Sequence, residues 1–161
     1  MMKRNFLLIL LFTVLCKAEV MKAENWMSRL SDATPISQLS VPGTHDTGTG
    51  NGFTPEWAEF GKTYAKTQDC SLAQQWASGI RAFDLRPAVA NDNGNAHLHI
   101  FHGMMKTQLS YEDAIRQLID SVTVSPSEFA FVVMRHEDDG DKGSKDWQPM
   151  MNAFLNSPGI K

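Results

Sequence analysis

Three apolar runs of the chain each end in side chains that can move protons or bind anions. His45 and Asp46 follow the first run, Asp84 and Arg86 close the second, and His102 closes the third. One histidine can take a proton from an attacking hydroxyl while another protonates the leaving oxygen, and a guanidinium can neutralise charge on phosphorus oxygens. This combination suits phosphoryl transfer without a metal, with Asp46 serving one of the two histidines.

A fourth polar cluster, Arg135 to Glu137, closes the last apolar run. Barrel enzymes keep their chemistry at one rim, where the strand ends meet, so we expect the four clusters to lie together. Alternation along a strand places Asp84 and Arg86 on the same face. Each cluster alone is weaker evidence, because Asp84-x-Arg86 also fits an ion pair that serves only the fold.

The stretch "HLHIFHG" separates its three histidines by strand face. His97 and His99 share one face, and His102 lies on the other with Leu98 and Ile100. Two histidines at this spacing can share a metal ion. They also fit a pair of partly exposed polar residues on an outer face, which is the interpretation we favour. We therefore predict no metal and no other cofactor.

The elements that must position these side chains alternate between helix and strand. The predicted helices span 24–30, 54–66, 71–78, 110–122 and 146–155, and the predicted strands span 36–41, 80–86, 97–101 and 129–134. Short apolar strands between helices favour a parallel α/β sheet that is covered on both faces. A (β/α)₈ barrel needs eight strands and about 250 residues, so four strands would supply only its first half.

The N-terminus reads as a secretory signal. Lys3 and Arg4 precede the apolar run from Phe6 to Leu15, which is shorter than the roughly 20 residues of a spanning helix. Small residues then follow at the spacing that a signal peptidase accepts, so we predict cleavage after Ala18 and a secreted or periplasmic protein. Cys16 is a less favoured alternative, a lipidation site.

The remaining chain, residues 19–161, has the composition of a single domain. Removal of the signal takes away three basic and no acidic residues, which leaves 12 basic and 18 acidic residues and a net charge of −6. Nucleic acid is therefore excluded as a partner, since its binding depends on clustered lysine and arginine. Only Cys70 remains, so no intramolecular disulfide is expected. We expect a monomer.

Four ordered motifs resemble those of a known family. They read "LSVPGTHDTGTG", "QQWASGIRAFDLRP", "LHIFHG" and "FAFVVMRHE", and they run from Leu39 to Glu137. Together they are similar to successive strand ends in the X domain of bacterial phosphatidylinositol-specific phospholipase C. The resemblance implies a distorted TIM barrel, a phosphatidylinositol lipid or its glycosylated form as substrate, and transient contact with a membrane surface.

The resemblance also implies a role for each site residue. His45 matches the general base that activates the inositol 2-hydroxyl, and His102 the general acid for the diacylglycerol oxygen. Asp46 matches the carboxylate that assists the acid, Arg86 the phosphate-binding group, and Asp84 a further active-site acid. The products would be diacylglycerol and a cyclic inositol phosphate, formed without a metal.

Two departures from the family pattern qualify this expectation. Arg135 stands where the family often has a substrate-contacting lysine, and a guanidinium and an ammonium are not interchangeable. The carboxylate that orients the base histidine comes, in the family, from the second half of the barrel. We therefore expect a partial X domain that is inactive on its own.

Two alternative functions remain open at this stage. A glycerophosphodiester phosphodiesterase shares the barrel and an early histidine but needs metal-binding carboxylates, and Arg86 stands where its metal would be. An inactive relative that only binds inositol headgroups has no need of both His45 and His102. Loss of activity in a chelator would favour the metal enzyme.

Overall fold

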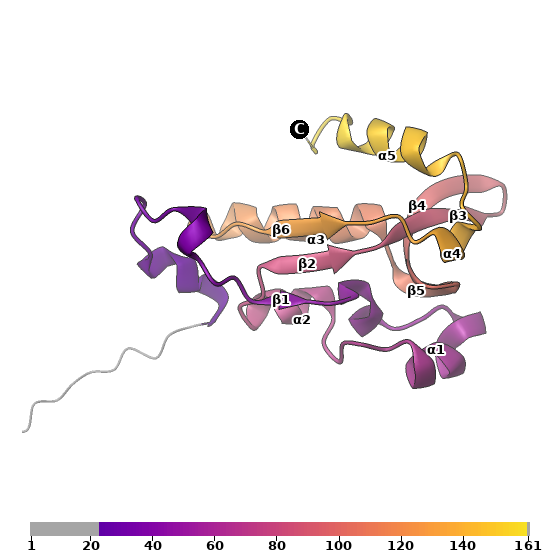
Figure 1. The fold of residues 1–161 in the computed structure, drawn as a ribbon, viewed down its shortest axis with the longest axis horizontal. Coiled ribbons are helices and arrows are strands. Elements are labelled where there is room, and N and C mark those ends of the chain that lie inside the picture. The colour runs from indigo at the N-terminus through magenta and orange to yellow at the C-terminus, as the bar shows by residue number, and fades with distance from the viewer. Residues whose placement is uncertain (1–22, 161) are drawn as a thin grey trace, which may run out of the picture.

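A computed structural model describes residues 23–160 as one α/β unit (Figure 1). The predicted signal peptide, with Cys16, lies outside the described residues. The elements are η1 (Ala23–Arg29), η2 (Ile36–Gln38), β1 (Gly43–Thr44), η3 (Thr47–Asn51), η4 (Pro55–Trp57), α1 (Ala58–Tyr64), α2 (Leu72–Ala77), β2 (Ala82–Leu85), β3 (Pro87–Asp92), β4 (Asn95–His102), β5 (Met105–Ser110), α3 (Tyr111–Val124), β6 (Phe131–Met134), α4 (Asp138–Asp141) and α5 (Trp147–Leu155). Within residues 23–160, no helix is long and apolar enough to cross a membrane.

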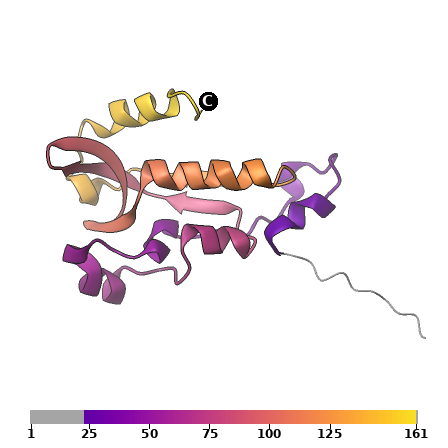
Figure 2. The same ribbon diagram turned by 180° about the vertical axis from the view of Figure 1, so that it is seen from behind.

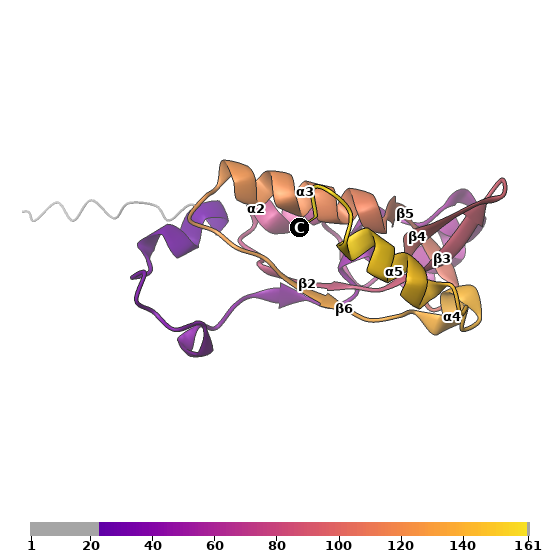
Figure 3. The same ribbon diagram turned by 90° about the horizontal axis from the view of Figure 1, so that it is seen from above.

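Three parallel strands in the order β1-β2-β6 form the central sheet. Helices α2 and α3 lie on one side of these strands (Figures 2 and 3). Phe83 and Leu85 of β2 point into this helical side and are buried, together with Leu72 of α2 and Leu118 of α3. The opposite face of the sheet carries Asp84, as the alternation along the strand predicts.

The predicted α/β class is confirmed, but the sheet differs from the expected one. Among the described residues the parallel strands number three, they form no closed barrel, and helices cover one face. Strand β6 is an edge of this sheet, and its four residues, Phe131–Met134, are all exposed.

The predicted strand 36–41 is wrong. Its first residues form the short 3₁₀ helix η2, and the strand is Gly43–Thr44, after the Pro42-Gly43 pair that we expected to end it. The reason is close packing: a Cβ on Gly43 would lie 2.9 Å from the Cβ of Ala82. Glycine is needed here for the approach of two strands rather than for a turn.

The predicted strand 97–101 is confirmed as β4, but it belongs to a second, antiparallel sheet with the order β3-β4-β5. Asn93 and Gly94 have φ of 55° and 84° at the turn between β3 and β4. Asn-Gly is a strong signal for a two-residue hairpin, and it was overlooked in the sequence. The second sheet stands at the carboxyl ends of β2 and β6 (Figure 1).

The helix caps follow the sequence. Ser71 accepts from the N–H of Gln74, whose side chain accepts from the N–H of Ser71, which completes a capping box at α2. Ser110 caps α3 by accepting from the N–H of Asp113. Gly79 follows α2 with a φ of +91°, as expected of a residue just beyond a helix end.

A fully buried ion pair joins the amino-terminal segment to the sheet. Arg81 Nε lies 2.9 Å from Glu128 Oε2, and both side chains are fully buried. The other oxygen of Glu128 accepts from the N–H of Met27 in η1. The guanidinium also lies 3.7 Å above the ring of Trp76. The pair therefore fixes η1 and α2 against the amino end of β2.

Candidate active site

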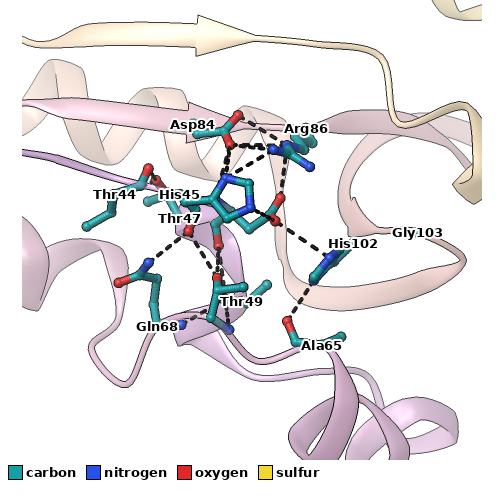
Figure 4. A network of polar contacts seen from close by, with 12 residues as sticks. Thr44, His45, Thr47, Thr49, Ala65, Gln68, Asp84, Arg86, His102 and Gly103 are labelled. Atoms are coloured by element: carbon teal, nitrogen blue, oxygen red, sulfur yellow. Dashed lines mark hydrogen bonds and ion pairs between the residues drawn. The ribbon is translucent and has the colours of Figure 1, made fainter.

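The polar clusters at the strand ends meet as predicted. His45 follows β1, Arg86 follows β2, and His102 ends β4, while Arg135 follows β6. Figure 4 shows His45, Asp84, Arg86 and His102 in one network of polar contacts. A cavity of about 440 Å³ opens over the uncovered face of the parallel sheet, and His45, Asp84, Arg86 and Arg135 are among its lining residues.

The loop after β1 holds His45 and Asp46 in a strained but well-supported conformation. Asp46 has φ 47° and ψ 50°, a left-handed conformation that aspartate tolerates better than most residues. The hydroxyl of Thr49 donates to the carbonyl of Asp46, and the amide of Gln68 donates to the carbonyl of His45. The N–H of Asp46 donates to Asp84 at 3.2 Å. Both site residues are therefore fixed through their backbone.

Arg86 is the central cation of the network. Its Nε lies 2.9 Å from Asp46 Oδ1, its Nη2 lies 2.8 Å from Asp84 Oδ2, and its Nη1 lies 3.7 Å from Glu137 Oε2. Burial works to lower the pKa of Arg86, but the hydrogen bonds that Arg86 donates to Asp84 and the three carboxylate charges outweigh it and raise the pKa. Arg86 is therefore held firmly as a cation.

Asp84 is held as an anion. Burial works to raise the pKa of its carboxyl group, but hydrogen bonds from Arg86 and from the N–H of Asp46, with the charges of Arg86 and His45, outweigh it and lower the pKa. The carboxylate of Asp46 is buried, and although charged groups lie close to it, neither oxygen has an aligned hydrogen bond. Its contacts are therefore mainly electrostatic.

One carboxylate, that of Asp46, lies between both histidines. Its Oδ2 is 3.0 Å from His45 Nε2 and 3.6 Å from His102 Nε2. The Nδ1 of His102 lies 2.7 Å from the carbonyl of Ala65, and a carbonyl only accepts, so Nδ1 carries a hydrogen. The nitrogen of His102 that can gain or lose a proton is therefore Nε2, which faces the carboxylate.

Both ring nitrogens of His45 face charged groups. Nε2 lies near Asp46, and Nδ1 lies 3.1 Å from Asp84 Oδ2 and 3.2 Å from Arg86 Nη2. The side chain is nevertheless 65% exposed. The ring of His45 contacts the protein through both nitrogens, and its exposure leaves room for it to rotate toward solvent.

Glu137 was overlooked as a site residue, although it was noted within the polar cluster after the last strand. Its carboxylate is buried, and Oε1 accepts from the N–H of Gly103, the residue after His102. Its Oε2 lies 3.7 Å from both Arg86 and Arg135. The sequence did contain a signal for this role: Glu137 lies two residues after Arg135, so in an extended segment both side chains point to the same side. Glu137 links the strand ends that carry His102 and the two arginines.

Arg135 reaches the site only at its margin. Its side chain is 62% exposed, and its one ion-pair contact in the described part of the chain is with Glu137. It lines the cavity beside Arg86. An exposed cation at the mouth of the cavity can meet an anionic group, and the substrate contact of Arg135 that the resemblance implies stays a prediction.

His97 and His99 lie apart from this network, as predicted, but their surroundings differ from the expected ones. His99 is buried, with 8% of its surface exposed, rather than partly exposed on an outer face. Burial is the main cause that lowers the pKa of His99. Within residues 23–160, no three histidine, cysteine, aspartate or glutamate side chains are placed to hold a metal ion.

Comparison with known proteins gives several close relatives, although no family model matches the sequence. The 1-phosphatidylinositol phosphodiesterase of Listeria monocytogenes is 36% identical over 134 residues, which cover 81% of this chain and 39% of the relative. The protein of the same name from Staphylococcus aureus strain Newman is 28% identical over 137 residues, 84% of this chain and 42% of the relative.

Solved structures give the same result. A variant of the S. aureus phosphatidylinositol-specific phospholipase C matches with a TM-score of 0.73 and 26% identity, over 87% of this chain and 44% of that one. The L. monocytogenes enzyme matches with a TM-score of 0.64 and 31% identity, over 84% and 47%. The chain thus spans less than half the length of these relatives. By sequence and by structure, the chain is a homologue of the bacterial phosphatidylinositol-specific phospholipases C.

Proposed function

We propose that this chain carries the acid and base histidines of a phospholipase C that cleaves phosphatidylinositol, or its glycosylated form, without a metal. The observation that supports this most directly is the buried carboxylate of Asp46, which lies between His45 and His102 and beside Arg86. A pair of histidines around one anion, with a guanidinium in reach, provides a base, an acid and an anion-binding group at one place.

In the proposed reaction, His45 takes the proton from the 2-hydroxyl of the inositol ring. The freed oxygen attacks phosphorus, so that a bond to the ring oxygen forms and the bond to the glycerol oxygen breaks. His102 gives its Nε2 proton to that glycerol oxygen, and the products are diacylglycerol and a cyclic inositol phosphate. Arg86 neutralises the charge on the phosphoryl oxygens, which is greatest in the transition state.

His45 must change its orientation to act as this base. Both of its ring nitrogens face Asp46, Asp84 and Arg86, so neither faces a substrate bound in the cavity. Its high exposure permits the ring to turn. The family resemblance implies an orienting carboxylate from the second half of a TIM-type barrel, and we propose that such a group draws the ring outward when the barrel is complete.

The proposed substrate is a lipid, which requires contact with a membrane surface. The rings of Phe60 and Tyr64 of α1 contact each other at a tilt and are 54% and 71% exposed, and Met104 in the turn after β4 is 60% exposed. α1 ends one residue before Ala65, whose carbonyl contacts His102. Solved structures of the S. aureus relative concern its membrane binding. We propose that Phe60, Tyr64 and Met104 enter the lipid surface beside the site. We also propose that the protein is secreted.

The test of activity is a hybrid enzyme in which residues 23–160 replace the matching part of the L. monocytogenes relative. We expect it to cleave phosphatidylinositol vesicles in the presence of EDTA and to release a cyclic phosphodiester, detected by ³¹P NMR. His102→Ala should lower kcat by about 10²–10⁴-fold, as for loss of a proton-transfer group. His97→Ala, on the other face of the same strand, should keep turnover.

Three results would contradict the proposal. A hybrid that melts cooperatively but cleaves no lipid would leave only headgroup binding. Activity that disappears in EDTA would favour a metal-dependent phosphodiesterase. Equal losses of kcat in His102→Ala and His97→Ala would show that the face of β4 on which a histidine lies does not matter.

For the membrane contact, Tyr64→Ser should weaken vesicle binding while hydrolysis of a soluble substrate is retained.

A further inference from the structure

A second pair of histidines lies on the hairpin of β3 and β4, away from the phosphodiester site. His97 Nε2 and His99 Nδ1 face each other at 3.3 Å. The side chain of His97 is 35% exposed, whereas His99 is buried. Both project from the face of β4 opposite to Leu98 and Ile100, which belong to the main core. The proposed catalytic chemistry makes no use of this pair.

The carbonyls around the pair favour hydrogen on one particular nitrogen of each ring. His99 Nε2 lies 2.9 Å from the carbonyl of Thr107, and His97 Nδ1 lies 3.2 Å from the carbonyl of Asn95. Carbonyl oxygens only accept, so both contacts are hydrogen bonds when these nitrogens are protonated. In neutral rings, His97 Nε2 and His99 Nδ1 then point lone pairs at each other. A shared cation would satisfy both.

A carboxylate completes the cluster. Asp92 Oδ2 lies 3.5 Å from His97 Nε2, and Lys106 Nζ lies 2.7 and 2.6 Å from the two oxygens of Asp92. Each of the three candidate ligands thus has an outer partner: Asn95 for His97, Thr107 for His99, and Lys106 for Asp92. Metal-binding imidazoles typically donate their second ring N–H to a carbonyl or carboxylate in this way.

We propose that His97 Nε2, His99 Nδ1 and Asp92 bind a divalent transition-metal ion of the class that prefers imidazole, such as Zn²⁺. Ligands at about 2.0–2.1 Å from a tetrahedral zinc ion lie roughly 3.3–3.4 Å from one another. The separations of 3.3 Å between the nitrogens and 3.5 Å between His97 and Asp92 are close to this value.

The carboxylate must move for all three ligands to meet. As the side chains stand, no three metal-binding groups of the described residues converge on one point. Asp92 is 56% exposed, so its side chain can turn and give up one oxygen from Lys106 while the other stays bound. Water would fill the fourth position. Mg²⁺ and Ca²⁺ prefer oxygen ligands, and two imidazoles therefore select against them.

The proposed ion would join the three strands of the antiparallel sheet. Asp92 comes from β3, the histidines come from β4, and their outer partners Lys106 and Thr107 come from β5. A ligand that binds only the folded chain raises its stability in proportion to its excess over the dissociation constant. The expected consequence is a metal-dependent rise in the melting temperature, independent of lipid cleavage.

The experiment is a titration of the full chain with Zn²⁺ by calorimetry, after treatment with EDTA and its removal, at pH 7.5. We expect one equivalent to bind, and His97→Gln, a change at a partly exposed position, to weaken binding at least tenfold. His45→Gln is the matched control, because His45 is the other imidazole that lies among carboxylates. It should bind zinc like the unchanged chain. Zinc should raise the melting temperature of the unchanged chain and of His45→Gln, but not that of His97→Gln.

Three outcomes would overturn the proposal. The first is an unchanged chain that binds no zinc, which would leave a plain hydrogen bond from His97 Nε2 to His99 Nδ1. The second is a His97→Gln variant that binds zinc as tightly as the unchanged chain. The third is loss of zinc binding in His45→Gln, which would place the ion among the residues of the candidate active site.

Discussion

Replacement of Arg86 by methionine should destabilise the chain in a way that depends on pH. Arg86 is the cation that contacts Asp46, Asp84 and Glu137, and its own side chain is only 12% exposed. Methionine keeps much of the apolar stem but removes the charge. Three carboxylates then lie close together, two of them almost fully buried, without the guanidinium that compensates them. Removal of one partner from a buried ion pair costs about 3–5 kcal/mol at neutral pH.

The pH dependence follows from the pKa of Asp84. In the unchanged chain this pKa is lowered, so the stability that its charge contributes is present above the unfolded value, near 3.9, and is lost as the pH falls through the lowered folded value. In Arg86→Met the hydrogen bond and the charge of Arg86 are gone, and only the N–H of Asp46 and the charge of His45 still oppose burial, so the folded pKa of Asp84 should rise. Charged Asp84 then destabilises the variant at pH 7, and protonation relieves the penalty as the pH falls toward 4.

Urea unfolding at pH 7 and pH 4 measures this difference. The variant should be less stable than the unchanged chain by about 3–5 kcal/mol at pH 7, roughly 6–20 °C in melting temperature for a chain of this size, and by clearly less at pH 4. Arg86→Lys keeps a positive charge and should lose less at pH 7. An equal deficit of Arg86→Met at both pH values would refute the reasoning, because it would show that the guanidinium contributes through packing and not through the carboxylates.

Three further predictions concern other parts of the network. In the hybrid enzyme, Glu137→Gln should lower kcat about tenfold or more, since a hydrogen bond to a charged group is worth roughly 1.5–3 kcal/mol, whereas a normal initial rate would remove Glu137 from the site. A good aryl leaving group should rescue the kcat of His102→Ala but not of His45→Ala, because only the acid is made dispensable. Glu128→Gln should lower the free energy of unfolding by about 3–5 kcal/mol in urea, and the double variant with Arg81→Met should recover part of that loss; simple additivity would contradict a direct coupling.

The catalytic candidates could be predicted because strand periodicity and residue type agree for them. Asp84 and Arg86 face away from the buried Phe83 and Leu85, as alternation requires, and His102 occupies the end of its strand. These relations depend only on local geometry. What local geometry cannot provide is the partner of a strand, and so β4 was assigned to the parallel sheet although the Asn-Gly turn pairs it with β3.

The remaining errors arise from contacts between residues far apart in the sequence. His99 appeared to be an exposed polar residue because nothing local shows that the carbonyl of Thr107 accepts from its ring. Glu137 appeared to be one member of a polar cluster, and its role depends on Gly103 and Arg86, which directly follow strands β4 and β2. A buried charged group is tolerated only where partners converge on it, and convergence is a property of the tertiary structure.

The position of the site depends on the glycine that was first interpreted as a strand end. Without a Cβ on Gly43, β1 lies close against β2, with Gly43 level with Ala82. Continuing this parallel pairing by two residues brings His45 level with Asp84, and the next N–H, that of Asp46, donates to the carboxylate of Asp84. The left-handed turn at Asp46 then directs its own carboxylate back toward Arg86. A histidine and a carboxylate therefore adjoin at a strand end because one backbone hydrogen bond and one turn place both beside the same arginine.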